Sequence, residues 1–183
     1  EMDIYMPTGD TVTNRPVIFY MHGGSFSAGS KNMTDCIDFC KIMAKRGYVA
    51  VSINYRLELN AIQFALSNSV QYETVLRAVA DAKAAIRYMR KDYMNGDTYG
   101  IDPNTFFVGG FSAGGVLAVH LAYINSITDL PTSPINVQNI MTNNGGFEGD
   151  AGNNGYSSTV TGVYSFAGGI NDLNWIDASD VPI

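Results

Sequence analysis

The sequence predicts an α/β protein with a mostly parallel central sheet and helices on both faces. Three short apolar runs, at residues 16–21, 48–54 and 106–108, contain few polar residues, which is typical of strands covered on both sides. Stretches with helical periodicity separate these runs. The resulting order of strand–helix–strand–helix–strand–helix–strand requires crossover connections, and these place helices on both faces of a parallel sheet.

Length and composition are those of a globular chain, and residues 1–183 are expected to form a single domain. Hydrophobic residues make up 46% and charged residues 15% of the chain. The net charge is −6 and no Lys/Arg cluster is present, so neither nucleic acid nor an anionic membrane is expected as a partner. No apolar run approaches the roughly 20 residues of a membrane span. No cofactor or metal is indicated, the oligomeric state is open, and a secreted or periplasmic location is favoured over a cytoplasmic one.

The first quarter of the chain predicts a strand and a helix around the first buried run. Met2–Met6 alternates between polar and apolar residues, as a half-buried strand does. Thr34 is expected to cap a helix that ends near Gly47. Cys36 and Cys40 lie on the apolar face of this helix, which favours buried thiols over a disulfide or a metal site.

The middle of the chain predicts a long connection followed by a long helix. The connection, residues 58–69, carries apolar side chains that either line a substrate pocket or pack against the core. The helix extends to about Tyr93. Its basic residues Lys83, Arg87 and Arg90 are expected to form an outer, solvated stripe.

The last third of the chain is loop-rich over residues 131–156. Glu148 and Asp150 carry oxygens that calcium could bind, but a mobile surface loop is the favoured interpretation. A strand is expected at residues 160–166, and a further strand is expected to begin at residues 180–183.

The strongest motif lies within residues 106–121, where an apolar run meets glycines and then an apolar helix. Gly110-Phe111-Ser112-Ala113-Gly114 matches the G-x-S-x-G nucleophile elbow, with Ser112 at the apex of a strand–turn–helix. A serine in this position has strained backbone angles, and its neighbours two positions away must be small. A glycine-rich turn without catalytic function is the alternative.

A second motif follows the first buried strand, about ninety residues before Ser112. His22-Gly23-Gly24-Ser25-Phe26 is of the H-G-G-G type, whose backbone amides can approach an oxyanion because glycines carry no side chain. His22 is expected to brace this loop rather than to act as a general base.

Together the two motifs resemble the α/β-hydrolase superfamily, and more closely its carboxylesterase, lipase and feruloyl-esterase-like members. The resemblance implies Ser112 as the nucleophile and an oxyanion hole formed by the amides of Gly24, Ser25 and Ala113. Ser25 stands where the loop motif has its third glycine. The remaining motif positions are expected to support the site: His22, Gly23, Gly110 and Gly114.

The function expected from this resemblance is hydrolysis of small-molecule carboxylic esters through an acyl-enzyme on Ser112. The alternatives are a serine peptidase of the same fold and a non-catalytic binding protein on a hydrolase fold. The superfamily order is Ser, then Asp or Glu, then His, and no histidine follows His120. His120 lies eight residues beyond Ser112, about 12 Å along a helix. The chain is therefore expected to be truncated at both ends, with the triad acid and histidine beyond Ile183.

One ion pair is also expected from the resemblance. Arg56, at the end of a strand, is expected to pair with Asp81 on the following helix. The alternative is a surface pair between Arg77 and Asp81, which are four residues apart.

Overall fold

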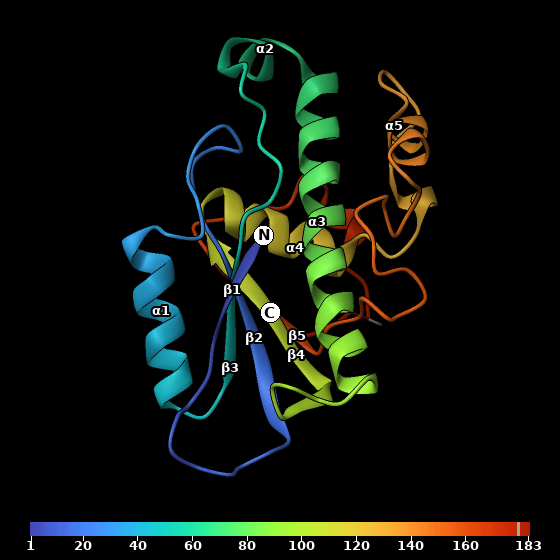
Figure 1. Ribbon diagram of the computed structural model, residues 1–183. Coiled ribbons are helices and arrows are strands. Elements are labelled where there is room, and N and C mark those ends of the chain that lie inside the picture. Colours follow the sequence, from blue (N-terminus) through green and yellow to red (C-terminus); the bar gives the residue numbers. More distant parts are fainter. Residues whose placement is uncertain (179) are drawn as a thin grey trace.

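The computed structural model describes residues 1–178 and 180–183, and its centre is a five-stranded sheet (Figure 1). The strand order is β1-β3-β2-β4-β5. Only the pairing of β1 with β3 is antiparallel among the described strands, so the sheet is mostly parallel, as predicted. The strands are β1 (Met2–Tyr5), β2 (Arg15–Met21), β3 (Val49–Ile53), β4 (Ile101–Phe111) and β5 (Gly162–Phe166).

Helices cover both faces of this sheet, which confirms the predicted α/β class. Successive side chains of a strand point to opposite faces, and β2 packs accordingly. Ile18 and Tyr20 lie in one apolar cluster with α1, whereas Val17, Phe19 and Met21 lie in the larger core with α3 and α4. The helices are α1 (Thr34–Lys45), α2 (Ala61–Leu66), α3 (Asn68–Met94), α4 (Ala113–Tyr123) and α5 (Val137–Asn143), with 3₁₀ turns at Ile127–Asp129 and Leu173–Trp175.

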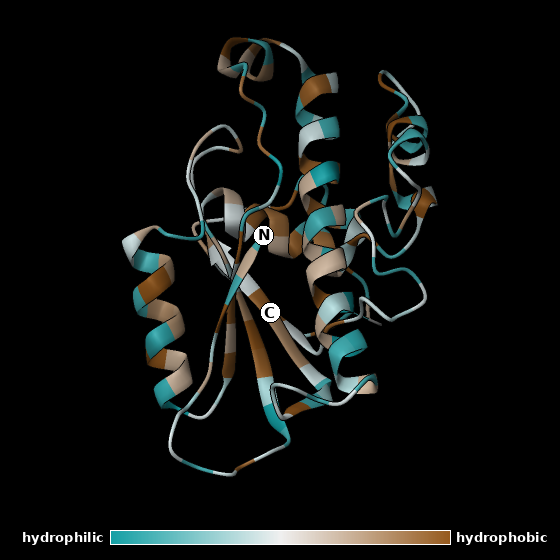
Figure 2. Cartoon of the chain, in the orientation of Figure 1, coloured by the Kyte–Doolittle hydropathy of each residue, from teal (hydrophilic) through white to brown (hydrophobic). Residues whose placement is uncertain are grey.

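The hydropathy of the chain follows these layers. Figure 2 shows apolar residues along the strands, and mixed polar and apolar residues along α1 and α3. Helix α4 is the exception, because it is apolar and buried nearly all round, as predicted. Among the described residues, none of the helices combines the length and the apolar character that crossing a membrane requires.

Several element boundaries differ from those predicted. Helix α1 begins at Thr34 itself, so Met33 occupies the cap position and no side chain caps the helix. Strand β4 begins at Ile101, five residues before the apolar run 106–108 that predicts it. The expected strand at residues 180–183 is absent from the described structure, although the carbonyl of Pro182 accepts a hydrogen bond from Val163 N at 2.9 Å.

Two short helices were not predicted. Helix α2 lies within the connection 58–69, and Asn60 caps it by accepting a hydrogen bond from Gln63 N at 3.0 Å. Helix α5 is capped in the same way by Asn136, which accepts from Asn139 N at 2.8 Å. Helices of six and seven residues are too short to show a clear period in the sequence.

The expected buried thiols of Cys36 and Cys40 are confirmed. Both side chains are fully buried and free. Burial raises the pKa of Cys36 to about 11 and that of Cys40 to about 12.

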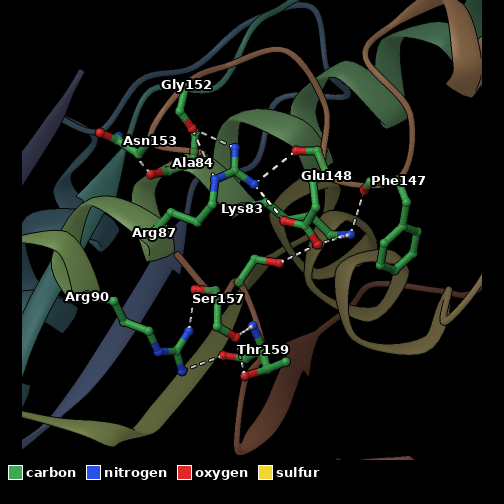
Figure 3. Close-up of polar contacts among 11 residues, drawn as sticks. Lys83, Ala84, Arg87, Arg90, Phe147, Glu148, Gly152, Asn153, Ser157 and Thr159 are labelled. Atoms are coloured by element: carbon green, nitrogen blue, oxygen red, sulfur yellow. Dashed lines mark hydrogen bonds and ion pairs between the residues drawn. The ribbon is translucent and has the colours of Figure 1, made fainter. Parts of the chain in front are cut away.

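The basic stripe of α3 is not solvated, which corrects the prediction. Lys83 is 3% and Arg87 is 1% exposed. Their side chains lie under the segment 147–159, which crosses this face of the helix (Figure 3). This segment is itself neither helix nor strand, so its carbonyl groups lack the backbone N–H donors of regular secondary structure. Among the described residues, cationic side chains of α3 donate to these carbonyls instead.

Arg87 makes the most contacts in this network. Its guanidinium donates to the carbonyls of Gly152 and Glu148 at 2.7–3.0 Å, and to the Glu148 carboxylate at 2.7 Å (Figure 3). Lys83 donates to the carbonyl of Phe147 at 2.7 Å. The carboxylate of Glu148 thus forms an ion pair with Arg87.

Arg90 holds the far end of the same segment. It donates to the carbonyls of Ser157 and Thr159, each at 2.7 Å (Figure 3). The part of the predicted surface loop that contains Glu148 and Gly152 is tied to α3 by hydrogen bonds, and its mobility stays a prediction. Within the described residues, no three His, Cys, Asp or Glu side chains are arranged to hold a metal ion.

The predicted pair of Arg56 and Asp81 is confirmed. The Arg56 guanidinium lies 2.9 Å from the Asp81 carboxylate, which also accepts the Arg56 amide at 2.7 Å. Arg56 additionally pairs with Asp150 at 3.0 Å. The side chain of Asp150, like that of Glu148, therefore ties the 147–159 segment to the rest of the fold.

The buried position of Lys83 predicts a pH dependence of stability. Burial lowers the pKa of Lys83 from 10.5 to about 8. Between these values the unfolded chain binds more protons than the folded chain, so the free energy of unfolding attributable to Lys83 rises with pH. Relative to the Lys83→Met variant, the wild type is expected to gain about 2–3 kcal/mol across this window. Denaturant unfolding of both proteins at several pH values gives the difference between their free energies of unfolding. The contributions of all other ionisable groups are the same in both proteins and cancel in this difference. A flat difference would contradict the prediction.

Candidate active site

Ser112 lies at the apex of a sharp turn between β4 and α4. Its backbone angles are φ 53° and ψ −115°, a conformation that costs a non-glycine residue about 1–3 kcal/mol. Two hydrogen bonds hold it: Ser112 N donates to Phe166 O of β5 at 2.8 Å, and Val116 N donates to Ser112 O at 2.9 Å. Among the described residues, no hydrogen bond engages the half-buried hydroxyl of Ser112, which leaves it available for chemistry.

The two flanking glycines of the elbow pack against the end of β2. A Cβ atom at Gly110 or at Gly114 would overlap the carbonyl oxygen of Met21. This close approach explains the small residues in the motif. It also brings Ser112 to the end of β2, where the loop at residues 22–26 begins.

Gly23 is the loop residue beside the serine. A Cβ atom on Gly23 would lie 3.5 Å from Ser112 Cβ and 3.3 Å from the carbonyl oxygen of Phe111. The next residue, Gly24, has φ +118°, and a side chain there would overlap the carbonyl of Ala28. The loop therefore passes the elbow with its backbone, not with its side chains.

The loop is a tight turn with strained residues. Ser25 and Phe26 have φ 51° and 57°, in the left-handed region. Gly24 O accepts hydrogen bonds from the amides of Ser27 and Ala28, both at 3.0 Å. An amide still stands at position 25, where serine replaces the third glycine of the motif.

Three backbone amides near the elbow are free of acceptors within the described part of the chain: Gly24, Ser25 and Ala113. Ala113 is the first residue of α4, so its amide is among those a helix leaves unpaired. The positive end of the α4 dipole adds to the local preference for negative charge. These groups can donate to an anion that forms beside Ser112.

His22 is buried against the loop. Its Nδ1 lies 2.6 Å from Gly23 O, and its ring stacks on Tyr55 with centroids 4.2 Å apart. Burial lowers its pKa, so the ring is neutral at pH 7. Since a carbonyl can only accept, Nδ1 is the donor. With these contacts to Gly23 and Tyr55, His22 is placed to support the loop.

Tyr55 is a supporting residue to which the sequence reasoning assigned no role. Its hydroxyl donates to His22 O at 2.7 Å, and the residue is 3% exposed. The signal in the sequence was an aromatic residue with a hydroxyl directly after a buried strand, because a buried tyrosine hydroxyl usually finds a partner.

His120 lies on α4, more than two turns beyond Ser112. It is 7% exposed, and its Nδ1 lies 2.8 Å from Val116 O. Trp175 contacts the ring edge-on, with centroids 5.4 Å apart. In the described part of the chain, no hydrogen bond joins His22 or His120 to Ser112.

A cavity of about 480 Å³ lies between α3 and α4. Val116, one turn after Ser112, and Gly169, three residues after Phe166, form part of its wall. Phe64 from the 58–69 connection also lines it, whereas Ile62 and Leu66 are 74% and 83% exposed. The connection thus lines a pocket through one of its apolar residues. Three further residues line the cavity and were assigned no role from the sequence: Tyr72, Asn171 and Trp175.

Comparisons with known proteins agree with this geometry. The chain is 33% identical over 120 residues to arylacetamide deacetylase from Oryctolagus cuniculus, covering 65% of this chain and 27% of that protein. It is 30% identical over 115 residues to neuroligin-like protein glit-1 from Caenorhabditis elegans, covering 62% of this chain and 14% of that protein. The chain thus spans about a quarter or less of these relatives.

A solved structure gives a similar result. The propionate-bound thermophilic esterase 2 of the planctomycete Thermogutta terrifontis matches with a TM-score of 0.62 and 27% identity, over 91% of this chain and 49% of that chain. The same esterase phosphorylated by paraoxon matches with a TM-score of 0.62 and 25% identity, over 91% of this chain and 51% of that one.

The family model described as BD-FAE matches residues 2–180, nearly the whole chain. With the elbow at Ser112, the loop at residues 22–26 and the esterase fold, the chain belongs to the BD-FAE family of carboxylesterase-like α/β-hydrolases.

Proposed function

We propose that this protein is a serine hydrolase that cleaves small-molecule carboxylic esters through an acyl-enzyme on Ser112. The observation that carries the proposal is the contact between the elbow and the loop: the strained Ser112 lies against Gly23, and nearby backbone amides have no acceptor among the described residues. The named esterases and the deacetylase among its relatives support the same chemistry.

In this mechanism the Ser112 oxygen attacks the ester carbonyl and forms a new C–O bond. The carbonyl oxygen becomes an oxyanion, which the amides of Gly24, Ser25 and Ala113 stabilise. One such donor is worth about 10²–10³-fold in turnover. The ester C–O bond then breaks, the alcohol leaves with a proton, and water hydrolyses the acyl-enzyme.

Ser112 requires a base within about 3 Å to take its proton. Within the described residues neither His22 nor His120 is hydrogen-bonded to Ser112, and His120 lies eight residues beyond Ser112 on α4. We therefore propose that the triad histidine and acid come from outside residues 1–183. Their identity is to be read from the full-length sequence.

The test uses the full-length protein with three reagents. Hydrolysis of p-nitrophenyl butyrate without cleavage of a peptide p-nitroanilide supports an esterase, whereas preferred cleavage of the anilide indicates a peptidase. A fluorophosphonate should label Ser112, as located by mass spectrometry of the labelled peptide. A protein that neither hydrolyses the ester nor reacts with the fluorophosphonate is a binding protein on a hydrolase fold, and the proposal fails.

The hydrogen bond from Tyr55 to the loop at residues 22–26 predicts that Tyr55 affects the rate of ester hydrolysis. Tyr55→Phe removes the hydroxyl that donates to His22 O at 2.7 Å. We expect kcat for p-nitrophenyl butyrate to fall about 3–10-fold, the worth of one neutral hydrogen bond, with KM little changed. Tyr123→Phe is the matched control, because it removes a similar bond to Val181 O at 3.3 Å away from the loop. Equal kcat values for the two variants would refute a positioning role for Tyr55.

A further inference from the structure

The cavity between α3 and α4 has mostly apolar walls with a few polar groups. Its volume is about 480 Å³, and Phe64, Val116, Ile124 and Trp175 contribute to its walls. None of its described lining residues is Asp, Glu, Lys or Arg. Pockets of this size with apolar walls and a few polar groups are typical of small-molecule sites. The lack of charge among these lining residues favours a neutral ligand.

His120 is the buried titratable group in this wall. The residue is 7% exposed, and its Nδ1 lies 2.8 Å from Val116 O. Because a carbonyl oxygen can only accept, Nδ1 carries the proton of the neutral ring and Nε2 carries a lone pair. Burial lowers the pKa of His120, so this tautomer holds at pH 7.

The Nε2 atom of His120 has no hydrogen-bond partner among the described residues. Two other side chains around the cavity have partners for their polar groups. Asn171 Nδ2 donates to Tyr72 Oη at 3.1 Å, and Trp175 Nε1 donates to Asp129 O at 2.8 Å. Among the described residues, Ser165 Oγ is the one side-chain atom that is buried without a hydrogen-bond partner, so Nε2 of His120 is reached from the cavity and can accept a hydrogen bond from a molecule that enters it. The cavity therefore favours a ligand that brings its own donor.

We propose that this cavity is a binding site for a neutral apolar alcohol, whose hydroxyl donates a hydrogen bond to Nε2 of His120. The apolar part of the ligand lies against Phe64, Val116 and Trp175. The proposal concerns binding alone, so it stands or falls independently of ester hydrolysis at Ser112.

Trp175 supplies the readout, since it is the single tryptophan in these 183 residues and lines the cavity. The full-length protein is titrated with 1-hexanol, with 1-fluorohexane, which is similar in size but has no O–H group, and with hexanoate. The Trp175→Phe variant gives the background, so that only the signal of Trp175 is analysed. We expect 1-hexanol to bind about 3–10-fold more tightly than 1-fluorohexane, and hexanoate to bind more weakly than either at pH 7.

Two variants of His120 test whether Nε2 causes the preference for 1-hexanol over 1-fluorohexane. In His120→Asn the side-chain amide replaces Nδ1 as donor to Val116 O but leaves no acceptor at Nε2, so the preference for the alcohol is expected to fall to about one. In His120→Gln an oxygen can occupy the Nε2 position, and the preference is expected to remain.

Equal binding of 1-hexanol and 1-fluorohexane by the wild type overturns the proposal, and so does a preference that survives in His120→Asn. If His120→Asn does not fold, the wild type alone provides the test through the ratio of its affinities for 1-hexanol and 1-fluorohexane. This ratio is expected to fall to about one below the pH at which His120 protonates. A ratio that stays unchanged through that titration also counts against the proposal.

Discussion

Replacement of Ser112 by alanine is expected to abolish hydrolysis of p-nitrophenyl esters by the full-length protein. The variant removes the only atom that attacks the carbonyl in the proposed mechanism, so kcat/KM should fall by about 10⁴-fold or more. Alanine keeps the Cβ atom, and both hydrogen bonds at this position belong to the backbone. The thermal midpoint of the variant is therefore expected to stay close to that of the wild type.

Ser25→Ala is the matched control for this experiment. Ser25 is exposed and is proposed to contribute only its backbone amide, which alanine retains. Its activity should stay within about 3-fold of the wild type. A Ser112→Ala protein that is folded and keeps more than a few per cent of the activity would disprove the acyl-enzyme proposal. A Ser25→Ala protein that loses activity would place a side chain, not an amide, at that position.

The elbow and its loop could be predicted from sequence because each is recorded in a short motif of fixed spacing. Gly110 and Gly114 are small since Met21 O leaves no room for a Cβ atom, and the spacing of the motif records this requirement directly. The positive φ of Ser112 follows from the same turn. The loop at residues 22–26 is similarly short, and its glycines mark the positions where the backbone approaches the elbow.

The α3 network could not be predicted because its partners are distant in sequence. Periodicity shows that Lys83, Arg87 and Arg90 share a face of α3, but it does not show what covers that face. The covering segment lies about 60–70 residues later in the chain. It is held mainly by side-chain donors on backbone carbonyls, and such bonds leave no periodic pattern in the sequence.

The cavity between α3 and α4 was missed for the same reason. Trp175 and Asn171 follow β5, while Phe64 precedes α3, so more than one hundred residues separate two parts of the wall. His120 appeared in the sequence only as a histidine too far from Ser112. Its bond to Val116 O, which fixes the tautomer, requires the helix to be in place.

Replacement of Arg87 by methionine is expected to lower the free energy of unfolding by about 1.5–3 kcal/mol, the worth of hydrogen bonds to a charged donor. Methionine fills much of the space of the 1%-exposed side chain, so the loss comes from the hydrogen bonds. The carbonyls of Gly152 and Glu148 lose their donors, and the Glu148 carboxylate keeps only Ser158 and the more distant Lys83. The acceptors that lose this charged donor account for most of the cost.

Two measurements check this prediction. Denaturant unfolding reports the change in global stability, and limited proteolysis reports cleavage within residues 147–159, which should become faster because the segment opens more often. Lys91→Met is the matched control, because Lys91 lies on the same helix but is exposed, and its effect should stay within about 0.5 kcal/mol. If Arg87→Met resembles Lys91→Met in both measurements, the network does not hold the segment. If proteolysis accelerates while global stability is unchanged, the 147–159 segment unfolds separately from the core, since the bonds of Arg87 then stabilise that segment alone.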